Sequence, residues 1–313
     1  MRNYITVDGG TTNTRVSLVQ NGKTVGSVRI SLGARAGMNG TAPLAQKIHE
    51  ALFSLLSDNG LSECDIERVL ASGMITSEFG LCKLDHISLP AGIAELHSTM
   101  HEVVLPEISA IPFVFIRGVK RVSTPDSLAL TDMMRGEECE LCGILREGDC
   151  ETLYVLPGSH SKLIRTDSEG RIVDFSTMLT GEMIGALATN TILADAVDLS
   201  VSELDEPMLR AGYLYANERG INEALFKVRI LKNVFGKNKE ELYSFFLGTV
   251  LFSEIDAIRR CGMRRIVIGG REQIKRATGI LLSALTDAEI VTLDENEVNA
   301  SVTTGQIRIY EYQ

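Results

Sequence analysis

The chain has 313 residues, of which 44% are hydrophobic and 23% charged, and its 31 Lys and Arg against 41 Asp and Glu give a net charge of −10. This length exceeds what one hydrophobic core usually supports, so two domains are expected. The negative charge argues against a nucleic-acid-binding surface, which needs a face rich in Lys and Arg. An anionic ligand would therefore need a site that is locally positive.

The sequence also predicts a reduced, cytoplasmic protein without a membrane span. No run of about 18 apolar residues is free of charge. Asn3 and Asp8 interrupt the region in which a signal peptide would be apolar. Among the six cysteines, Cys139 and Cys142 have the only metal-like spacing, and no second pair or nearby His completes a metal site.

Strands and helices are predicted to alternate along the chain. In order, the first half contains a hairpin (4–25), a glycine-rich loop (31–40), an amphipathic helix (42–58), a strand leading into a loop (66–80), a strand (111–118) and a helical segment (131–145). The second half contains a hairpin (153–173), helices (182–197, 206–217, 221–233, 238–261), a buried strand (264–270), a helix (271–285), a strand (288–293) and a final segment open between helix and strand. This alternation is typical of α/β proteins.

The two hairpins resemble each other. Each consists of an apolar strand, a turn rich in Gly and hydroxyl residues, a second strand, a tight turn and a third strand, and Gly9 aligns with Gly158. Backbone amides of a glycine turn can converge on an anion, and glycine allows a close approach. The duplication therefore suggests two similar halves that hold a polyphosphate in a central cleft.

The first hairpin carries an acid and hydroxyl groups at its turn. Asp8 ends an apolar strand and is suited to hold a hydrated divalent cation, whereas the turn amides and hydroxyls are suited to phosphate. These turn residues are Gly9, Gly10, Thr11, Thr12 and Asn13. A hairpin that uses Asp and Gly only for its geometry is the alternative, but three threonines (Thr11, Thr12 and Thr14) and an Asn exceed what a turn needs.

The second hairpin offers donors of the same kind. Ser159, Ser161 and the amides around Gly158 are candidates to bind phosphate, and Lys162 adds a positive charge. His160 is given no chemical role.

A later Gly269-Gly270 pair lies between a strand and a helix, which suits an adenosine lying across bare backbone. The sequence has neither the dinucleotide fingerprint nor the P-loop motif.

The segment from Asp132 to Glu138 contains the candidate catalytic groups. If it is helical, Asp132 and Arg135 share one face. Asp132 could then accept a hydroxyl proton while Arg135 pairs with an anionic substrate, and Glu137 is the second candidate base. A solvated charged turn of a helix is an equally good interpretation. Glu182 is either a metal ligand or a first-turn residue favoured by the helix dipole.

Six motifs in this order, DGGTTNTR, SGMITSEFG, LPAG, MMRGEE, LPGSHSKL and MLTGE, resemble the 2-dehydro-3-deoxygalactonokinase family of the actin-like ATPase, sugar kinase and heat-shock chaperone superfamily. The resemblance covers nearly the whole chain. It implies two actin-like (ribonuclease H-like) α/β domains, expected at 1–145 and 146–313, with the sugar-acid site in the first and the adenosine site in the second.

The resemblance also implies an activity, in which ATP and Mg²⁺ serve to phosphorylate the 6-hydroxyl of a 2-keto-3-deoxy sugar acid. Asp8 through Thr12 and Gly158 through Ser161 would hold phosphates and metal, and Gly269 and Gly270 would flank the adenosine. Residues bordering the sugar acid would be Arg35, Gly73, Met74 and Ser77, with Arg135 also contacting its carboxylate. A homodimer is one open arrangement.

Some residues depart from the family pattern, and three further functions compete with this one. Glu78, Phe79 and Leu81 and the loop 33–40 differ from what the family leads us to expect, so the C4 epimer of the sugar acid stays open. A chaperone or filament ATPase would need more chain for a peptide-binding domain or insertions. A type III pantothenate kinase and a non-catalytic sugar-acid sensor on the same fold also stay open. Asp8 and Asp132 argue against the sensor, and MRGEE and PGSHSK argue against the pantothenate kinase.

Overall fold

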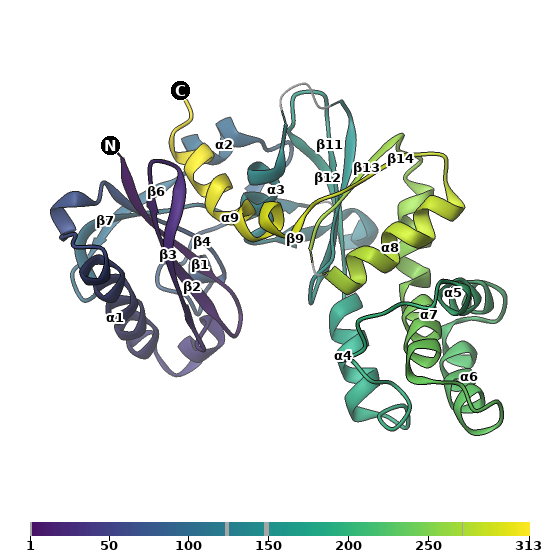
Figure 1. Ribbon diagram of the computed structural model, residues 1–313. Helices are drawn as coiled ribbons and strands as arrows, with labels where there is room; N and C mark the ends of the chain where they lie inside the picture. Colours follow the sequence, from purple (N-terminus) through teal and green to yellow (C-terminus); the bar gives the residue numbers. More distant parts are fainter. Residues whose placement is uncertain (1, 123–124, 147–149, 271) are drawn as a thin grey trace. The chain divides into compact units, whose positions relative to one another are not determined.

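A computed structural model of the protein describes residues 2–122, 125–146, 150–270 and 272–313 (Figure 1). The chain folds into two compact units. Unit 1 comprises Met1–Cys150, Asp167–Asp174 and Asn296–Gln313, and unit 2 comprises Glu151–Thr166 and Phe175–Glu295. The chain thus returns to unit 1 for its last helix. A functional domain boundary after residue 145 stays a prediction.

Unit 1 is built on a six-stranded sheet of order β3-β2-β1-β4-β7-β6. The strands are β1 (Asn3–Gly9), β2 (Thr14–Gln20), β3 (Lys23–Ile30), β4 (Arg68–Gly73), β6 (His101–Leu105) and β7 (Ser109–Phe115). Strands β1, β2 and β3 form the predicted antiparallel hairpin meander. Strands β1, β4 and β7 run parallel. The carboxyl ends of β1 and β4 therefore meet at one edge of the sheet.

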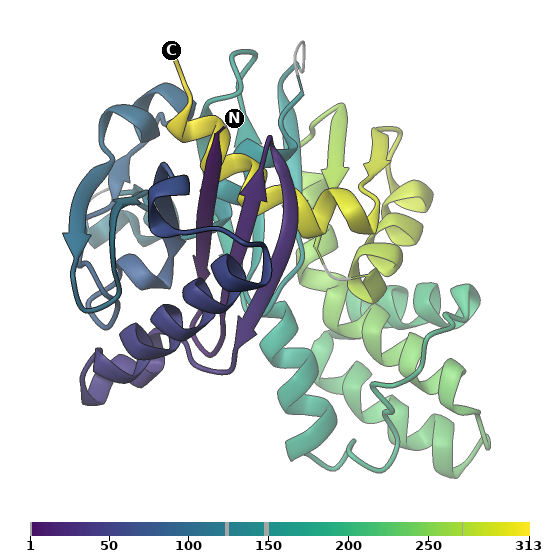
Figure 2. The ribbon, with the colours of Figure 1, turned by 60° about the vertical axis from the view of Figure 1, so that its left-hand side comes forward.

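Helices cover both faces of this sheet. Helix α1 (Ala42–Asp58) buries its Leu stripe against Ile5 and Val7, which point to one face of β1. Figure 2 shows α1 lying across this face. Tyr4 points to the opposite face because side chains alternate along a strand, and there it packs on Tyr310 of α9 (Glu295–Tyr310). The C-terminal segment, left open by the sequence, is therefore a helix.

The prediction of one helix over 131–145 is wrong. Strand β9 (Asp132–Met134) pairs with β8 (Val119–Arg121) in a small sheet that also contains β5 (Ile87–Ser88). Helix α3 (Glu137–Ile144) begins only after Gly136, whose φ of 114° lies in the left-handed region and interrupts a regular helix. Asp132 and Arg135 consequently do not share a helical face.

Short elements complete unit 1. They are η1 (Ala34–Asn39), η2 (Glu63–Asp65), η3 (Met74–Thr76), α2 (Ile93–Ser98) and η4 (Pro125–Leu130).

Unit 2 repeats the strand order of unit 1. Its five-stranded sheet has the order β12-β11-β10-β13-β14, which matches β3-β2-β1-β4-β7. The strands are β10 (Thr152–Leu156), β11 (Ser161–Thr166), β12 (Ile172–Met178), β13 (Arg265–Ile268) and β14 (Glu289–Thr292). The start of β12, up to Asp174, is grouped with unit 1. Strand β10 is antiparallel to β11 and parallel to β13, just as β1 is antiparallel to β2 and parallel to β4. The duplication read from the sequence is thus a duplication of topology.

The helices of unit 2 are α4 (Thr180–Asn190), α5 (Glu206–Arg219), α6 (Ile221–Asn233), α7 (Lys239–Arg260) and α8 (Glu272–Leu285). Helices α5, α6 and α7 lie side by side, and α7 supplies much of the core (Figure 1). Helix α4 ends earlier than the predicted residue 197. At its end the Thr191 hydroxyl donates to Leu187 O and accepts from Leu193 N, which gives the backbone an alternative to the helix. Arg271, the first residue of the predicted helix 271–285, lies outside the described residues.

Candidate functional site

Three glycines meet at the carboxyl ends of β1 and β4. Gly9 and Gly73 are register partners, and a Cβ on Gly73 would lie 2.5 Å from Gly9 O. A Cβ on Gly9 would lie 2.6 Å from Ile75 Cβ, and one on Gly136 would lie 3.3 Å from Gly73 Cα. Gly73 and Gly136 also have φ values of 82° and 114°, which side chains rarely adopt. We call Gly9, Gly73 and Gly136 the unit 1 glycine cluster.

The turn of the first hairpin is joined to the loop that carries Arg35. Gly10 N donates to Asn13 O at 2.8 Å, which closes the turn and leaves Thr11 and Thr12 exposed. Two further hydrogen bonds of 3.0 Å run from Ala34 N to Gly10 O and from Arg35 N to Thr11 O. The exposed Arg35 side chain therefore starts beside the hairpin turn, and the structure brings together two segments that the sequence singled out separately.

Carboxylates gather beside the unit 1 glycine cluster. Burial raises the pKa of Asp8, Arg15 opposes this shift and Glu137 adds to it. Burial also raises the pKa of Glu140 to about 8, with Glu137 and Asp8 adding to the effect. Asp8 and Glu140 thus interact electrostatically with each other and with Glu137, and a cation bound beside Asp8 would favour its charged form.

Helix α3 begins with an unusual arrangement that fixes Glu137. Both carboxylate oxygens of the buried Glu138 accept from Gly136 N at 2.8 Å. Glu137 Oε2 accepts from Arg135 N at 3.1 Å. Carboxylates at a helix N-terminus are favoured by the helix dipole. The two glutamates therefore hold the turn that joins β9 to α3.

Asp132 is placed differently from Glu137. It lies on β9 of the small sheet, paired in register with Arg121, and its Oδ1 accepts from Met133 N at 2.7 Å. Asp8, in contrast, interacts electrostatically with Glu137. Of the two candidate bases, Glu137 is thus the one the structure couples to the Asp8 carboxylate.

The guanidinium of Arg135 is engaged by the neighbouring chain. It donates to Thr76 O at 2.7 Å, to Thr76 Oγ1, to Leu84 O at 3.1 Å and to His86 Nδ1 at 3.2 Å. Burial and the positive charge of Arg135 lower the pKa of His86 to about 4, so the imidazole is neutral and able to accept this bond. Arg135 therefore joins the start of α3 to the segment Met74–Ser77, which the sequence assigned to the sugar acid.

That segment holds a buried hydroxyl. Ser77 Oγ is buried and makes no hydrogen bond within the part of the chain that the structure describes. Met74 is half-buried, and Gly80 packs against Ile75 O while Gly37 packs against Phe79 O. The loop that carries Arg35 is therefore packed on this segment.

Unit 2 has a glycine cluster of its own. A Cβ on Gly181, at the start of α4, would lie 2.1 Å from Gly158 O, and one on Gly270 would lie 2.2 Å from Pro157 O. Gly270 has a φ of 74°. Gly269 N donates to Val155 O at 2.9 Å, and Glu182 N donates to Ser159 O at 3.1 Å. We call Gly158, Gly181 and Gly270 the unit 2 glycine cluster.

The polar side chains of this second loop point in different directions. Ser159 and His160 are exposed, and His160 Nε2 lies 3.0 Å from Glu182 Oε1. Ser161 and Lys162 are buried at the start of β11. Three side chains were predicted to contact phosphate, those of Ser159, Ser161 and Lys162. Of these three, only Ser159 is exposed.

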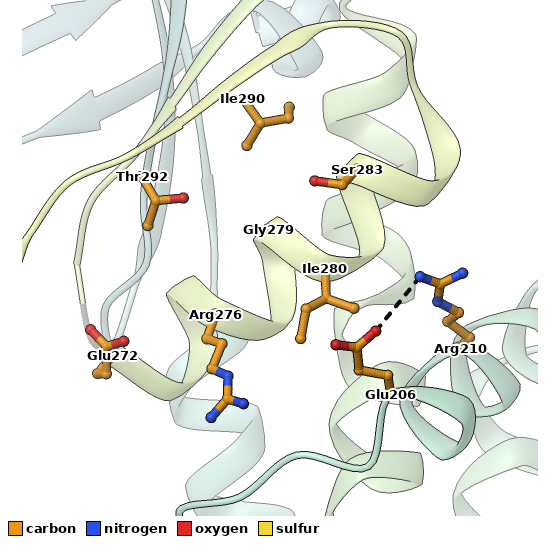
Figure 3. Close-up of a pocket in the computed structure, with 9 residues that line it drawn as sticks. All are labelled: Glu206, Arg210, Glu272, Arg276, Gly279, Ile280, Ser283, Ile290 and Thr292. Atoms are coloured by element: carbon orange, nitrogen blue, oxygen red, sulfur yellow. Dashed lines mark ion pairs between the residues drawn. The ribbon is translucent and has the colours of Figure 1, made fainter.

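A pocket of about 430 Å³ lies elsewhere in unit 2, between α5, α8 and β14 (Figure 3). Arg210 and Arg276 line it, but Arg210 pairs with Glu206 at 3.8 Å and Arg276 with Glu203 at 3.6 Å. The lining also includes Glu272. Because carboxylates balance the arginines, this pocket lacks the net positive charge that a phosphate site needs.

The sequence matches a known protein family over almost its whole length. A model of the 2-keto-3-deoxy-galactonokinase family matches residues 8–304, a range that contains both glycine clusters. The chain belongs to this family. The resemblance read from the motifs is therefore confirmed, and so is the coarse conclusion that the chain is a kinase of this family.

Relatives and solved structures agree with this membership. A 2-dehydro-3-deoxygalactonokinase from Escherichia coli K12 is 28% identical over 261 residues, covering 82% of this chain and 80% of that protein. A solved Sinorhizobium meliloti protein named for the same activity has a TM-score of 0.77 at 22% identity, covering 98% of this chain and 97% of that one. The activator of 2-hydroxyisocaproyl-CoA dehydratase from Clostridium difficile, solved with ADPNP, has a TM-score of 0.54 at 15% identity, covering 99% and 95%. The predicted α/β fold of the actin-like ATPase type is thereby confirmed.

Sequence reasoning missed two buried polar residues near the glycine clusters. Gln306 of α9 donates from Nε2 to Val7 O at 3.0 Å and to Ser72 Oγ at 2.8 Å, and so holds the ends of β1 and β4. Glu254 of α7 accepts from Thr180 Oγ1. Neither has a local sequence signal, because each lies on a helix far along the chain from its partners.

Membrane spans and preformed metal clusters are both missing from the part of the chain that the structure describes. Among its residues, no helix combines the length and apolar character needed to cross a bilayer. Nor do the described residues contain a group of three or more His, Cys, Asp or Glu side chains placed to hold a metal ion. A cation at Asp8 would therefore depend on few protein ligands, as Mg²⁺ often does.

Proposed function

We propose that the protein is an ATP-dependent kinase that phosphorylates the terminal 6-hydroxyl of a 2-dehydro-3-deoxy sugar acid, with 2-dehydro-3-deoxygalactonate as the preferred substrate. The observation that carries this proposal is the repeated glycine cluster in a member of this kinase family. Each cluster presents bare backbone at the end of parallel strands, where phosphoryl or sugar groups can approach closely.

Unit 2 is the proposed nucleotide-binding unit. The amides around Gly158, the exposed Ser159 and the first turn of α4 would contact phosphates, since a helix N-terminus favours anions. Gly269 and Gly270 would flank the adenosine. The buried Ser161 and Lys162 would support this loop from within the unit, and Lys162 would add positive charge beneath it.

Unit 1 is the proposed sugar-acid unit. Arg35 is exposed beside the hairpin turn, and its guanidinium can bind a carboxylate through two parallel hydrogen bonds. Gly73, Met74 and Ser77 would border the sugar, with the buried Ser77 hydroxyl as a donor or acceptor. Because the structure engages Arg135 with Thr76, Leu84 and His86, we give Arg35 the carboxylate and Arg135 the role of holding this segment.

The proposed base is Glu137. In the reaction the sugar hydroxyl oxygen forms a bond to the γ-phosphorus, the bond from that phosphorus to the β,γ-bridging oxygen breaks, and ADP leaves. The hydroxyl proton passes to Glu137, whose Oε2 is held by the Arg135 backbone amide at the start of α3. Asp132 on the small sheet is the alternative base.

Asp8 would hold Mg²⁺ in unit 1, and Glu182 is the candidate ligand in unit 2. The residues fit this ion, because hard carboxylate oxygens are its usual protein ligands and the half-buried Asp8 carboxylate, whose pKa is raised by burial, would be favoured in its charged form by a nearby cation. When bound, Mg²⁺ neutralises phosphate charge during transfer.

The test is ADP release with Mg-ATP against a panel of 2-keto-3-deoxy sugar acids of both C4 configurations, with pantothenate included. We expect turnover with the sugar acids and a preference for the galacto form. Turnover with pantothenate alone would favour the pantothenate-kinase alternative. A folded protein that binds a sugar acid but releases no ADP with any compound would favour the sensor.

A further inference from the structure

Unit 2 contains a buried carboxylate that the proposed mechanism does not use. Glu254 lies on α7 and is 1% exposed. Its Oε2 accepts a hydrogen bond from Thr180 Oγ1, which is also buried. Removing a carboxylate from water costs free energy unless hydrogen bonds or an opposite charge compensate for the lost hydration. Burial accordingly raises the pKa of Glu254, and the hydroxyls of Thr180 and Ser161 oppose this shift.

A second hydroxyl, that of Ser161, lies near the Glu254 carboxylate. Glu254 Oε1 and Ser161 Oγ are both buried, and each lacks a hydrogen bond of normal geometry among the described residues. The Ser161 hydroxyl nevertheless lies close enough to lower the pKa of Glu254. Ser161 Oγ is therefore a second hydroxyl that can interact with the Glu254 carboxylate.

Thr180 and Ser161 belong to the two segments that form the unit 2 glycine cluster. Ser161 directly follows the turn 157–160, and Thr180 directly precedes Gly181. Gly181 touches the turn backbone, because an added Cβ there would lie 2.1 Å from Gly158 O, and Glu182 N donates to Ser159 O at 3.1 Å. The buried Glu254 therefore bonds one segment at Thr180 and interacts electrostatically with Ser161 at the end of the other.

We infer that Glu254 is a positioning residue, which fixes the turn 157–160 and the first turn of α4 relative to each other so that their amides converge on the nucleotide phosphates. This inference rests on the proposed nucleotide-binding role of unit 2. Glu254 itself does not touch the nucleotide, since it is enclosed by Thr180, Ser161 and the core. It keeps the loop rigid before the ligand arrives, which lowers the ordering cost of binding.

The experiment compares three single variants with wild type by calorimetric titration with Mg-ADP. Glu254→Met keeps the length of the side chain but removes both acceptors. Glu254→Gln keeps an acceptor for Thr180 Oγ1. Thr249→Val is the matched control, because it removes a buried hydroxyl of α7 that bonds Phe245 O and does not touch the hairpin turn.

Glu254→Met should weaken Mg-ADP binding by about tenfold, the effect of one lost hydrogen bond to a charged group. Glu254→Gln should restore most of the affinity, and Thr249→Val should bind as wild type does even if its Tm is lower. Amide hydrogen exchange of the unliganded proteins should be faster within 157–161 in Glu254→Met alone. If Glu254→Met does not fold, Thr180→Val removes the other partner of the same bond and should show the same loss.

The outcomes separate this inference from the proposed function. Equal Mg-ADP affinity of wild type and Glu254→Met, with unchanged exchange at 157–161, would overturn the inference alone. An equal loss of affinity in Thr249→Val would also overturn it, because the effect would then be one of stability. A wild-type protein that binds no nucleotide would overturn the proposed function, and the role of Glu254 with it.

Discussion

Units 1 and 2 share a backbone arrangement and differ in the charges placed around it. In both, the first strand of a hairpin lies parallel to a second strand that ends in glycine or is directly followed by it, and a glycine at the start of a helix packs on the same edge. Near this edge unit 1 has the carboxylates of Asp8, Glu137 and Glu140 and the exposed hydroxyls of Thr11 and Thr12. Unit 2 has the hydroxyls of Ser159, Ser161 and Thr180 there, together with the carboxylates of Glu182 and Glu254. The proposed function assigns proton and cation chemistry to unit 1 and nucleotide phosphate binding to unit 2 of this shared scaffold.

The largest effect is expected when a carboxylate of unit 1 is removed. Glu137→Gln should lower kcat by at least ~10²-fold, because the hydroxyl proton loses its acceptor, while the affinity for Mg-ADP is retained. Steady-state kinetics with the best sugar acid measure it. Asp132→Asn is the matched variant and should lower kcat much less. The reverse order would return the role of base to Asp132.

A smaller effect is expected at the glycine cluster of unit 2. Gly181→Ala places a methyl group 2.1 Å from Gly158 O, so the neighbouring backbone must shift. This change should raise the KM for ATP by about tenfold. Gly185→Ala is the control, because an added Cβ there meets nothing within 4 Å. Both kinetic constants for the sugar acid should stay near wild type. A similar change in the two alanine variants would mean that helix α4, not its contact with the turn, matters.

Arg35 offers the corresponding test in unit 1. Arg35→Ala should raise the KM for the sugar acid about five- to tenfold, the usual effect of losing a charge-assisted hydrogen bond at an exposed site, and leave the KM for ATP unchanged. Arg219→Ala, which removes an exposed arginine of unit 2 paired with Glu218, is the control. Unaltered sugar-acid kinetics in Arg35→Ala would show that another group binds the carboxylate.

The smallest expected effect is on the pH dependence of stability, and it tests the buried carboxyl groups of unit 1. The pKa of Glu140 is raised from 4.5 to about 8, so between these values the folded state keeps a proton that the unfolded state releases. Stability therefore falls as pH rises through this window, and Glu140→Gln should lose less of it. The Tm of Glu140→Gln minus the Tm of wild type should grow by a few degrees between about pH 5 and pH 8. A constant difference in Tm would mean that Glu140 is charged in both states.

Local patterns predicted the hairpins, several further strands and most helices, because turn glycines and the apolar stripe of α1 act over short distances. They did not predict that these further strands pair in parallel. The break between β9 and α3 was missed because it depends on two features that local patterns do not show. One is the strand pairing of β9 with β8, in which Asp132 lies opposite Arg121, and the other is the left-handed backbone conformation of Gly136. Motifs likewise pointed to Asp8, Gly158 and Gly270. They gave no sign that Arg135 bonds Thr76 and Leu84, or that Gln306 holds Val7, since these contacts join segments far apart in the chain.

The division of labour between the units is tested most directly by measuring the binding of each ligand separately. Calorimetric titration of Arg35→Ala and Gly181→Ala with the sugar acid and with Mg-ADP gives four affinities to compare with wild type. We predict a reciprocal result, in which Arg35→Ala weakens only sugar-acid binding and Gly181→Ala weakens only Mg-ADP binding. The assignment of nucleotide to unit 2 and sugar acid to unit 1 would be contradicted if Arg35→Ala weakened Mg-ADP binding and Gly181→Ala weakened sugar-acid binding. It would also be contradicted if either folded variant lost the binding of both ligands.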